Sequence, residues 1–567
     1  MNSNYPQRFS KISPLLLCLW TVLGLVFRFY NLDLKPPSSI EIATIGYSLG
    51  HGFNQIAVDS LVDLNTLLAS LRLDLSIGYQ AVWERLVQES THPPLYFWLT
   101  RWWGGIWLKN GEIMSLQVAR SLSAILGGMA IPSIFVCSWV AFRSRRAAHF
   151  AAILMAFSPY GIYLAQSARH YTLTVLWVIV SLTCLIEALR LIGQKQTVPL
   201  GLGFIWVMVN GLGVATHYFF VLALGAEAIA VVAFWFGLRQ QPISRYLRSL
   251  MFVGLGSLAA ALVWLPVAMG ISGNEMTTWI ATDYDLDELF LPLPRLLTWA
   301  ITMVMLLPVE GIDKNLAVVS GLIILTVLIL VVPALFQQWR RAIANSPTRI
   351  GTTIMTGYLV GSLGIFLFLI YGLGRDISLA ARYHFVYFPA LIAIVAIALA
   401  NCQLPAIGKT PLTKIVALVL VMLVLGAQTV VNDWGFQKSR SADALAAYIQ
   451  QTSISSPLVA MTHQTHSEIR EMVALALSFE RLDRTNNSSG TPQFTLVSDN
   501  QYGMTNLGLN LQQALSTQSP ALDLIGVNLD IKDSGLKKLG CDRDKKRNLS
   551  DSGYGDRFYL CSSSANN

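Results

Sequence analysis

The chain has 567 residues, of which 54% are hydrophobic and only 13% are charged. A soluble protein carries roughly twice that charged fraction, so the composition excludes an ordinary soluble enzyme and predicts a membrane protein. The net charge of +8 does not indicate nucleic-acid binding, because the basic residues fall in short loops between apolar runs.

Apolar runs recur along the first 431 residues, and each is long enough to cross the hydrocarbon core of a bilayer as a helix. The first run follows Arg8 and Lys11 and has no small-residue cleavage site after it. We therefore expect a retained span rather than a signal peptide. The pattern predicts eleven helices, at residues 13–30, 117–141, 147–166, 171–192, 199–216, 218–238, 247–270, 316–336, 352–373, 383–401 and 413–431.

The charges of the connecting segments predict the orientation. Six segments assigned to the inner side hold fifteen Lys or Arg and no Asp or Glu, whereas the outer loops 31–116 and 271–315 are acidic. Because Lys and Arg favour the cytoplasmic side, we expect an integral protein of a bacterial inner (plasma) membrane. Its N-terminus is then cytoplasmic and its C-terminal region extracytoplasmic.

Two further apolar stretches, 94–108 and 292–308, are expected to lie flat on the outer surface. If the first stretch crossed the membrane, the basic segment Phe142–Arg146 would fall outside. Tryptophans and Arg101 in this stretch suit an interfacial helix. A crossing of both stretches would keep the orientation of the chain ends, so thirteen spans is the alternative.

After Val431 the sequence becomes that of a soluble domain, rich in Asn, Ser and Thr. A helix is predicted at 441–451 and a strand at 494–499, so we expect a small extracytoplasmic α/β domain over 432–567. A disulfide between Cys541 and Cys561 is expected there, since such bonds persist in oxidising compartments. Residues 1–431, including the outer loop 31–116, form the predicted transmembrane domain.

Polar clusters of the transmembrane domain converge on its outer side. With the predicted orientation, residues 40–44 and 91–94 lie in the first outer loop, and 167–173, 216–220 and 379–385 emerge on the same face. Several Arg and His side chains gathered on one face suggest a pocket for an anionic ligand at the membrane interface.

Six segments, most of which include one of these clusters, carry a resemblance to a known family. RFYNLDLKPPSSIEIATIGYSL, STHPPLYFWL, VARSLSAILG, SPYGIYLAQSARHYTL, THYFF and ARYHFVYFPAL follow one another as in glycosyltransferase family 39 and the dolichyl-phosphate-mannose protein mannosyltransferase-like group. The likeness covers roughly residues 15–400. It implies an all-α polytopic membrane enzyme of the GT-C fold. It also implies a polyprenyl-phosphate-linked sugar as donor, and an inverting single displacement onto a lipid, glycan or protein acceptor on the outer face.

Such a transfer needs a carboxylate base for the acceptor, and cations or amide donors for the leaving phosphate. Family members place an Asp-Glu pair after the first span, where this chain has Ile40-Glu41. Many family members also have Glu-Ala-Arg at the position where this chain has Ser167-Ala168-Arg169, so Ser167 replaces the Glu. Glu41 is therefore the candidate base, and a solvated acid at a helix start is the alternative.

Arginine and histidine side chains are the candidate ligands of the donor phosphate. Guanidinium groups match phosphate oxygens, although an interfacial arginine also snorkels without binding anything. The prolines after His92 fit the start of an interfacial helix, and His217 is interpreted as a metal ligand, a sugar ligand or a packing residue. The candidate donor and substrate ligands are His92, Arg120, Arg169, His170, Tyr171, His217, Arg382 and Tyr383.

No nucleotide-binding loop or other cofactor motif is present. Asp283, Asp285, Asp287 and Glu288 share one outer loop, where a divalent metal ion is one interpretation and a solvated acidic loop the favoured one. The expected partners are membrane lipids, a polyprenyl-phosphate sugar and an unidentified acceptor.

Two other functions are weighed against the transferase. The replacements at Ile40 and Ser167 favour a catalytically inactive relative that binds lipid-linked glycan or a partner. A transporter or flippase would need polar residues along a path at the bilayer midplane, whereas the polar clusters noted above lie at one edge of the helices.

Overall fold

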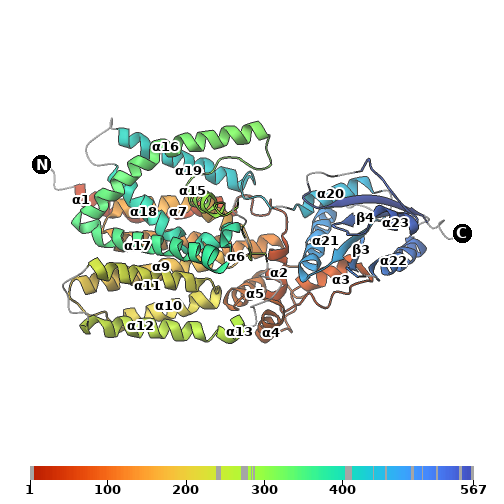
Figure 1. The fold of residues 1–567 in the computed structure, drawn as a ribbon, viewed down its shortest axis with the longest axis horizontal. Helices are drawn as coiled ribbons and strands as arrows, with labels where there is room; N and C mark the ends of the chain where they lie inside the picture. The colour runs from red at the N-terminus through yellow and green to blue at the C-terminus, as the bar shows by residue number, and fades with distance from the viewer. Residues whose placement is uncertain are drawn as a thin grey trace. The chain divides into compact units, whose positions relative to one another are not determined.

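The computed structural model describes residues 5–237, 244–269, 279–282, 284, 288–402, 411–438, 440–453, 456–486, 491–500, 502–518, 521–547, 549 and 552–562. The fold is mostly helical with one small sheet, and it divides into two compact units (Figure 1). Unit 1 comprises Met1–Leu32, Thr91–Tyr96 and Arg120–Gln437, and unit 2 comprises Asp33–Ser90, Phe97–Ala119 and Lys438–Asn567.

Unit 1 is a bundle of apolar helices, in which α11 packs against α17, and α10 packs against both α9 and α12 (Figure 1). Its elements are α1 (Tyr5–Phe29), α6 (Leu116–Phe142, in this unit from Arg120), α7 (Arg145–Phe157), α8 (Pro159–Ala165), α9 (Tyr171–Gly193), α10 (Leu200–Thr216), α11 (Phe220–Gly237), α12 (Ser244–Leu262), α13 (Leu265–Met269), α15 (Pro292–Thr302), α16 (Lys314–Ala344), α17 (Ser346–Leu367), η2 (Phe368–Gly372), η3 (Ile377–Leu379), η4 (Ala381–Val386), α18 (Phe388–Asn401) and α19 (Pro411–Val431).

Five helices among the described residues are long and apolar enough to cross a membrane, namely α6, α9, α16, α17 with its extension, and α19. The pair α7 and α8 passes the same test together but bends by 54°. Each of the eleven predicted spans overlaps with one of these helices, with the bent pair, or with a shorter apolar helix, and the predicted span 383–401 is α-helical only over Phe388–Asn401. The number of spans that cross a membrane stays a prediction.

The two stretches predicted to lie flat form short helices. The helix α5 (Leu95–Trp107) has 13 residues and α15 has 11. At about 1.5 Å of rise per residue, they measure roughly 20 and 17 Å, less than the roughly 30 Å of a hydrocarbon core. Neither helix is long enough to span alone, and the choice between eleven and thirteen spans stays a prediction.

The bend between α7 and α8 exposes backbone carbonyls that a single arginine satisfies. Ser158 begins α8 by accepting a hydrogen bond at Oγ from the Gly161 N–H at 3.0 Å. The helical ladder is interrupted there, and the carbonyls of Met155 and Ala156 each accept a bond from the Arg28 guanidinium at 2.9 Å. Arg28 is fully buried, and it was not singled out in the sequence.

Replacing Arg28 with lysine or methionine should destabilise unit 1. Lysine donates from one point and cannot reproduce the planar fork, and a buried carbonyl left without a donor costs about 1–3 kcal/mol. Thermal unfolding of the full chain in detergent measures the effect, with the exposed Arg349→Lys as the matched control. An unchanged melting temperature in Arg28→Met would contradict this account of the bend.

Unit 2 contains a six-stranded sheet in the order β1-β3-β2-β4-β6-β5, in which β3, β2 and β4 are parallel and the other pairs antiparallel. Residues of β2 and β4 are almost all buried, as expected for parallel strands covered on both faces. The strands are β1 (Leu61–Asp63), β2 (Leu458–His463), β3 (Gln493–Ser498), β4 (Ala521–Val527), β5 (Cys541–Arg543) and β6 (Asp556–Ser562).

The helices of unit 2 come from both the first outer loop and the C-terminal region. The predicted helix at 441–451 and strand at 494–499 correspond to α20 and β3. The helices of unit 2 are α2 (Ser39–Ser48), α3 (Leu64–Leu68), η1 (Ala69–Leu71), α4 (Tyr79–Glu89), α5, α20 (Ala442–Thr452), α21 (His466–Asn486), α22 (Gly503–Gln518) and α23 (Asp533–Lys538).

Most of the first outer loop, which was predicted as part of the transmembrane domain, lies in one unit with the C-terminal residues, whereas its Thr91–Tyr96 segment belongs to unit 1. Strand β1 pairs with β3, with Leu61 opposite Thr495, and α2 and α3 both pack on α21. A strand of three residues has too little periodicity to show its partner in the sequence.

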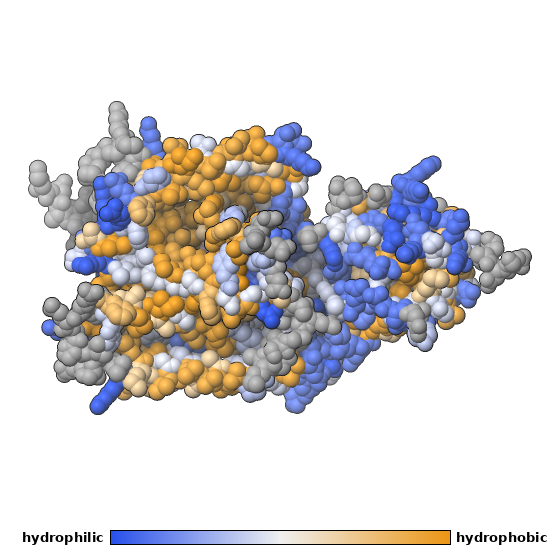
Figure 2. All heavy atoms as spheres, viewed as in Figure 1, coloured by the Kyte–Doolittle hydropathy of each residue, from blue (hydrophilic) through white to orange (hydrophobic). Residues whose placement is uncertain are grey.

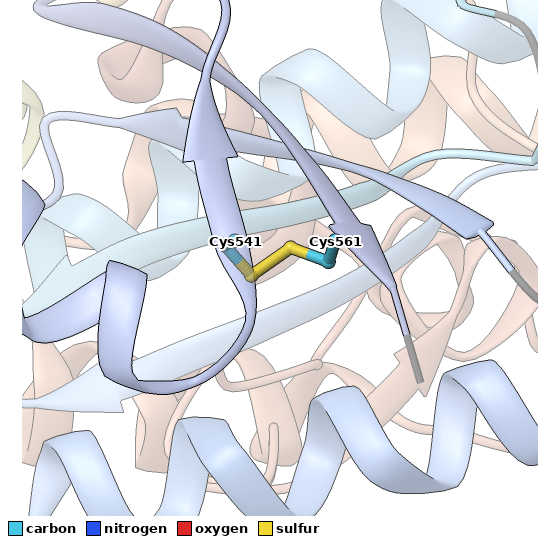
Figure 3. The surroundings of a disulfide bond; sticks show 2 residues. All are labelled: Cys541 and Cys561. Carbon is cyan, nitrogen blue, oxygen red and sulfur yellow. A yellow bond between two sulfur atoms is a disulfide. The ribbon is translucent and has the colours of Figure 1, made fainter. Parts of the chain in front are cut away.

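Cys541 and Cys561 form a disulfide between β5 and β6, where the two residues lie directly opposite each other (Figure 3). Both side chains belong to the hydrophobic core of the sheet, with Leu524, Leu507 and Tyr559. The bridge ties the edge strand β5 to the rest of the sheet. The other four cysteines are free thiols: Cys18, Cys137, Cys184 and Cys402.

The two units differ in surface character. Figure 2 shows apolar side chains over much of the visible face of unit 1, whereas the visible face of unit 2 is largely polar. In α16, for example, Leu322 and Ile329 are 58% and 64% exposed. Exposed apolar helices of this extent fit a lipid environment.

Candidate functional site

Four segments of unit 1 bring histidines and arginines together. They are the Thr91–Tyr96 segment, the turn between α8 and α9, the residue that ends α10, and the 3₁₀ helix η4. The imidazole rings of His92, His170 and His217 are in contact, and we call these three residues the histidine cluster. Their ring centroids are 5.1 Å apart for His92 and His170, 4.6 Å for His170 and His217, and 6.1 Å for His92 and His217.

Arg169 is held against this cluster by its side chain and by its backbone. Its Nη2 lies 2.9 Å from His92 Nε2; because a guanidinium only donates, His92 Nε2 is the acceptor. The hydroxyl of Ser123 donates to the Arg169 carbonyl at 3.0 Å, and Tyr96 Oη lies 2.7 Å from Ser123 Oγ. The single Ser123 proton is thereby used, so the Tyr96 hydroxyl donates to Ser123. Neither Tyr96 nor Ser123 was predicted as a site residue.

Arg382 approaches the cluster from η4. Its guanidinium carbon lies 5.2 Å from the ring centroid of Trp279 and 5.1 Å from that of Tyr383, distances typical of cation–π contacts. The hydroxyl of Tyr160 in α8 donates to the Ala381 carbonyl at 3.0 Å and fixes the start of η4. Tyr163, Tyr171 and Tyr383 act electrostatically on Arg382, and within the described ranges no carboxylate forms an ion pair with it.

The histidines at the centre of the site are neutral. Burial, and then the charges of Arg169 and Arg382, lower the pKa of His217 to about 3. Burial is also the largest cause that holds the pKa of His170 well below its ordinary value, followed by its histidine and arginine neighbours. Since His217 Nδ1 accepts the Phe219 N–H at 2.9 Å, the neutral ring carries its proton on Nε2. The positive charge of the site therefore belongs to the arginines.

The His170 side chain is fully buried, yet neither ring nitrogen has a hydrogen-bond partner within the part of the chain that the structure describes. Buried polar groups in folded proteins are nearly always paired, with protein, water or ligand. Two arginines, an imidazole N–H and this unpaired ring together suit an anion that also carries hydroxyl groups.

The structure brings most of the predicted ligands into this site. The ring of Tyr171 lies 4.4 Å from that of His170, and the ring of Tyr383 lies 6.3 Å from that of His217. Arg120 is fully buried and donates to the Leu32 carbonyl at 3.1 Å, which gives it a structural partner.

Glu41 belongs to unit 2, where it is completely buried in the first turn of α2. Its Oε2 accepts a hydrogen bond from Ser38 Oγ at 2.9 Å and forms an ion pair with Lys438. The Lys438 ammonium also donates to the Pro36 carbonyl at 2.8 Å. The solvated-acid interpretation of Glu41 is therefore wrong, because the side chain has no contact with solvent.

The hypothesis of a divalent metal ion has no support among the described residues, where no group of three or more His, Cys, Asp or Glu side chains could hold one. Asp283, Asp285 and Asp287 of the acidic loop lie outside those residues. The metal stays a prediction at that loop.

Comparison with known proteins gives distant structural similarity. No family model matches the chain, and no curated protein is significantly similar to it. Over 97% of its length the chain is similar to 98% of ArnT from Cupriavidus metallidurans, solved bound to undecaprenyl phosphate and in the apo state, at 12% and 13% identity and a TM-score of 0.49 in both.

A second similarity is to the Archaeoglobus fulgidus oligosaccharyltransferase tethered with an acceptor peptide. It covers 82% of this chain and 63% of that one, at 13% identity and a TM-score of 0.45. Similarity at this distance carries no assignment of function, which is therefore argued from the residues of this chain.

Proposed function

We propose that this chain is a membrane glycosyltransferase that moves a sugar from a polyprenyl-phosphate-linked donor to an acceptor on the extracytoplasmic face. The observation that carries the proposal is the pairing of Arg169 and Arg382 around a neutral histidine cluster. Guanidinium groups bind phosphate oxygens in a bidentate manner. Neutral imidazoles supply hydrogen bonds to phosphate or sugar without adding charge.

The proposed reaction is a single displacement at the anomeric carbon. A lone pair of the acceptor hydroxyl or amine forms the new bond as the bond from that carbon to the phosphate oxygen breaks, and the electron pair leaves with the phosphate. Arg169 and Arg382 stabilise the charge that grows on this phosphate, and His217 Nε2–H donates a further hydrogen bond. No proton is needed on the leaving group, because a phosphate is already a stable anion.

Glu41 stays the predicted base for the proton that the acceptor loses, although its completely buried carboxylate does not reach an acceptor in this structure. Its carboxylate is kept ionised by the Lys438 ammonium, which is the state required of a base. The same ion pair also supports an alternative, in which Glu41 only fastens α2 to the start of the C-terminal region. An inactive relative that binds lipid-linked glycan is the second candidate function, favoured by the hydrophobic Ile40 beside Glu41.

The test is transfer of radiolabelled sugar from a panel of polyprenyl-phosphate sugars by the purified full chain in lipid vesicles. Binding of unglycosylated polyprenyl phosphate is measured beside it. Transfer to a lipid, glycan or peptide acceptor would support the enzyme. Binding without transfer to any acceptor would favour the inactive relative, and the absence of both would overturn the proposed function.

A further inference from the structure

A second group of polar side chains is buried in the middle of unit 1, away from the ends of its helices. It consists of Ser181 in α9, Trp206 and Asn210 in α10, Glu227 in α11 and Ser257 in α12, and all five are at most 8% exposed. Polar residues inside apolar helices are costly, and an ionisable one among them marks a functional position. None of the five was predicted as a site residue.

These residues form one connected hydrogen-bond network. Ser181 Oγ lies 2.7 Å from Asn210 Oδ1 and 2.5 Å from Glu227 Oε1. Trp206 Nε1 lies 2.9 Å from Ser181 Oγ and 3.2 Å from Glu227 Oε2, and Asn210 Nδ2 donates to Ser257 Oγ at 2.8 Å. The network therefore joins four consecutive helices of the chain.

The network lies deep within a helix that is long enough to span. Ser181 is ten residues from the first residue of α9, which is about 15 Å along the axis and close to the middle of this 23-residue helix. An ionised carboxylate at that depth needs a cation to offset its desolvation. No Lys, Arg or His of the described residues pairs with Glu227, and the titratable groups that interact with it are Tyr358 and Cys184.

We infer that Glu227 is a protonated, neutral positioning residue that locks α9 against α10 and α11. The Glu227 O–H donates to Ser181 Oγ, the Ser181 O–H donates to Asn210 Oδ1, and the Trp206 N–H donates to Glu227 Oε2. Every polar atom then has one partner. With an ionised carboxylate, the single Ser181 proton would face two acceptors. If the Asn210 amide were turned to point its N–H₂ group at Ser181, the Ser181 proton would be free for the carboxylate. The negative charge of Glu227 would still lack a cation.

A further hydrogen bond between α9 and α10 lies between the network and the candidate site. Nearer the start of α9, Trp177 Nε1 donates to Thr216 Oγ1 of α10 at 3.0 Å. The next residue of the chain after Thr216 is His217, whose ring meets that of His170 just before α9 begins. Polar contacts thus fix α9 and α10 from their middle to the ends that carry the two histidines. The consequence for sugar transfer rests on the proposed function, whereas the protonation of Glu227 does not.

Infrared difference spectroscopy of the full chain in lipid tests the protonation. The C=O stretch of a buried protonated carboxylic acid, with its shift in D₂O, should be present in the unmodified protein and absent in Glu227→Gln. It should be retained in the control Glu187→Gln, which removes a partly exposed acid of α9 that pairs with Arg143 and, within α9, with Arg190. The lack of such a band, or its survival in Glu227→Gln, would overturn the inference.

A rescue series tests the positioning role. Glu227→Gln keeps an N–H for Ser181 and an oxygen for Trp206, so its melting temperature and transfer rate should stay close to those of the unmodified protein. Glu227→Leu keeps the volume but removes both bonds, and kcat should fall by up to about 10²-fold, because small displacements of positioned groups have effects of that size, with a smaller change in KM. Equal kcat in the Gln and Leu variants would refute the positioning role. If the unmodified protein transfers no sugar, that result contradicts only the proposed function. The infrared measurement of Glu227 does not depend on transfer.

Discussion

Replacing Arg382 with alanine should lower transfer by about 10²–10³-fold, the loss found when one preorganised donor is removed from a site where negative charge develops. Arg382 is held by Trp279 and Tyr383 and has no carboxylate partner among the described residues. We propose that its charge binds the donor phosphate. Binding of polyprenyl phosphate to the purified protein should weaken together with the rate.

The variant Arg382→Lys separates charge from geometry. It keeps one positive charge but loses the planar fork, so binding should be intermediate between the unmodified protein and Arg382→Ala. The exposed Arg349→Ala on α17 serves as the control and should change neither quantity. If Arg382→Ala folds, binds polyprenyl phosphate and transfers sugar at the unmodified rate, the anion site is not where we place it.

Glu41→Gln should destabilise unit 2 and abolish transfer, and adding Lys438→Met should restore stability without restoring transfer. Removing one partner of a buried ion pair costs about 3–5 kcal/mol, because the other charge stays buried without compensation. Lys438 is 18% exposed, so we expect the lower end of that range. Removing both charges relieves the penalty, yet the double variant still lacks a base.

Thermal unfolding and transfer are measured on all members of this cycle. The ion pair of Arg481 with Asp443 offers a matched control in the same unit, with side chains 27% and 31% exposed. Asp443→Asn should cost much less, because partly exposed pairs contribute little. Recovery of transfer in the Glu41→Gln, Lys438→Met protein would show that the pair is only structural, and the proposed base would fall.

The helical part of the fold was predictable because its signal is local. An apolar run of spanning length between basic loops identifies a helix without knowledge of its neighbours, and every predicted span overlaps with an apolar helix. The composition of the C-terminal residues predicted a small α/β fold in the same way, whereas the part of unit 2 that comes from the first outer loop was not predicted. The pairing of β1 with β3 was not, since it joins segments far apart in the chain and involves three residues on one side.

The candidate site was predictable as a gathering of residue types but not as a set of contacts. The sequence placed His92, Arg169, His217 and Arg382 on one face, and the structure brings them around His170. Roles that depend on a distant partner could not be predicted from the sequence. Arg28 donates to the carbonyls at the α7–α8 bend, and Lys438 pairs with Glu41 from 397 positions away. Glu227 lay inside an apolar run, where one acid among hydrophobic residues gives no sign of a network.

The short edge strand β1 has a consequence for biosynthesis. Asp63 pairs with Gln493, so about 430 residues must be translated before the partner exists. At roughly 5–20 residues per second, this takes on the order of 20 to 90 s, during which nearly all of unit 1 is made. The first outer loop must therefore wait, already synthesised, with its strand unpaired. A strand of only three residues offers little edge for wrong pairing in that interval, which makes its shortness an advantage while the ribosome is still at work.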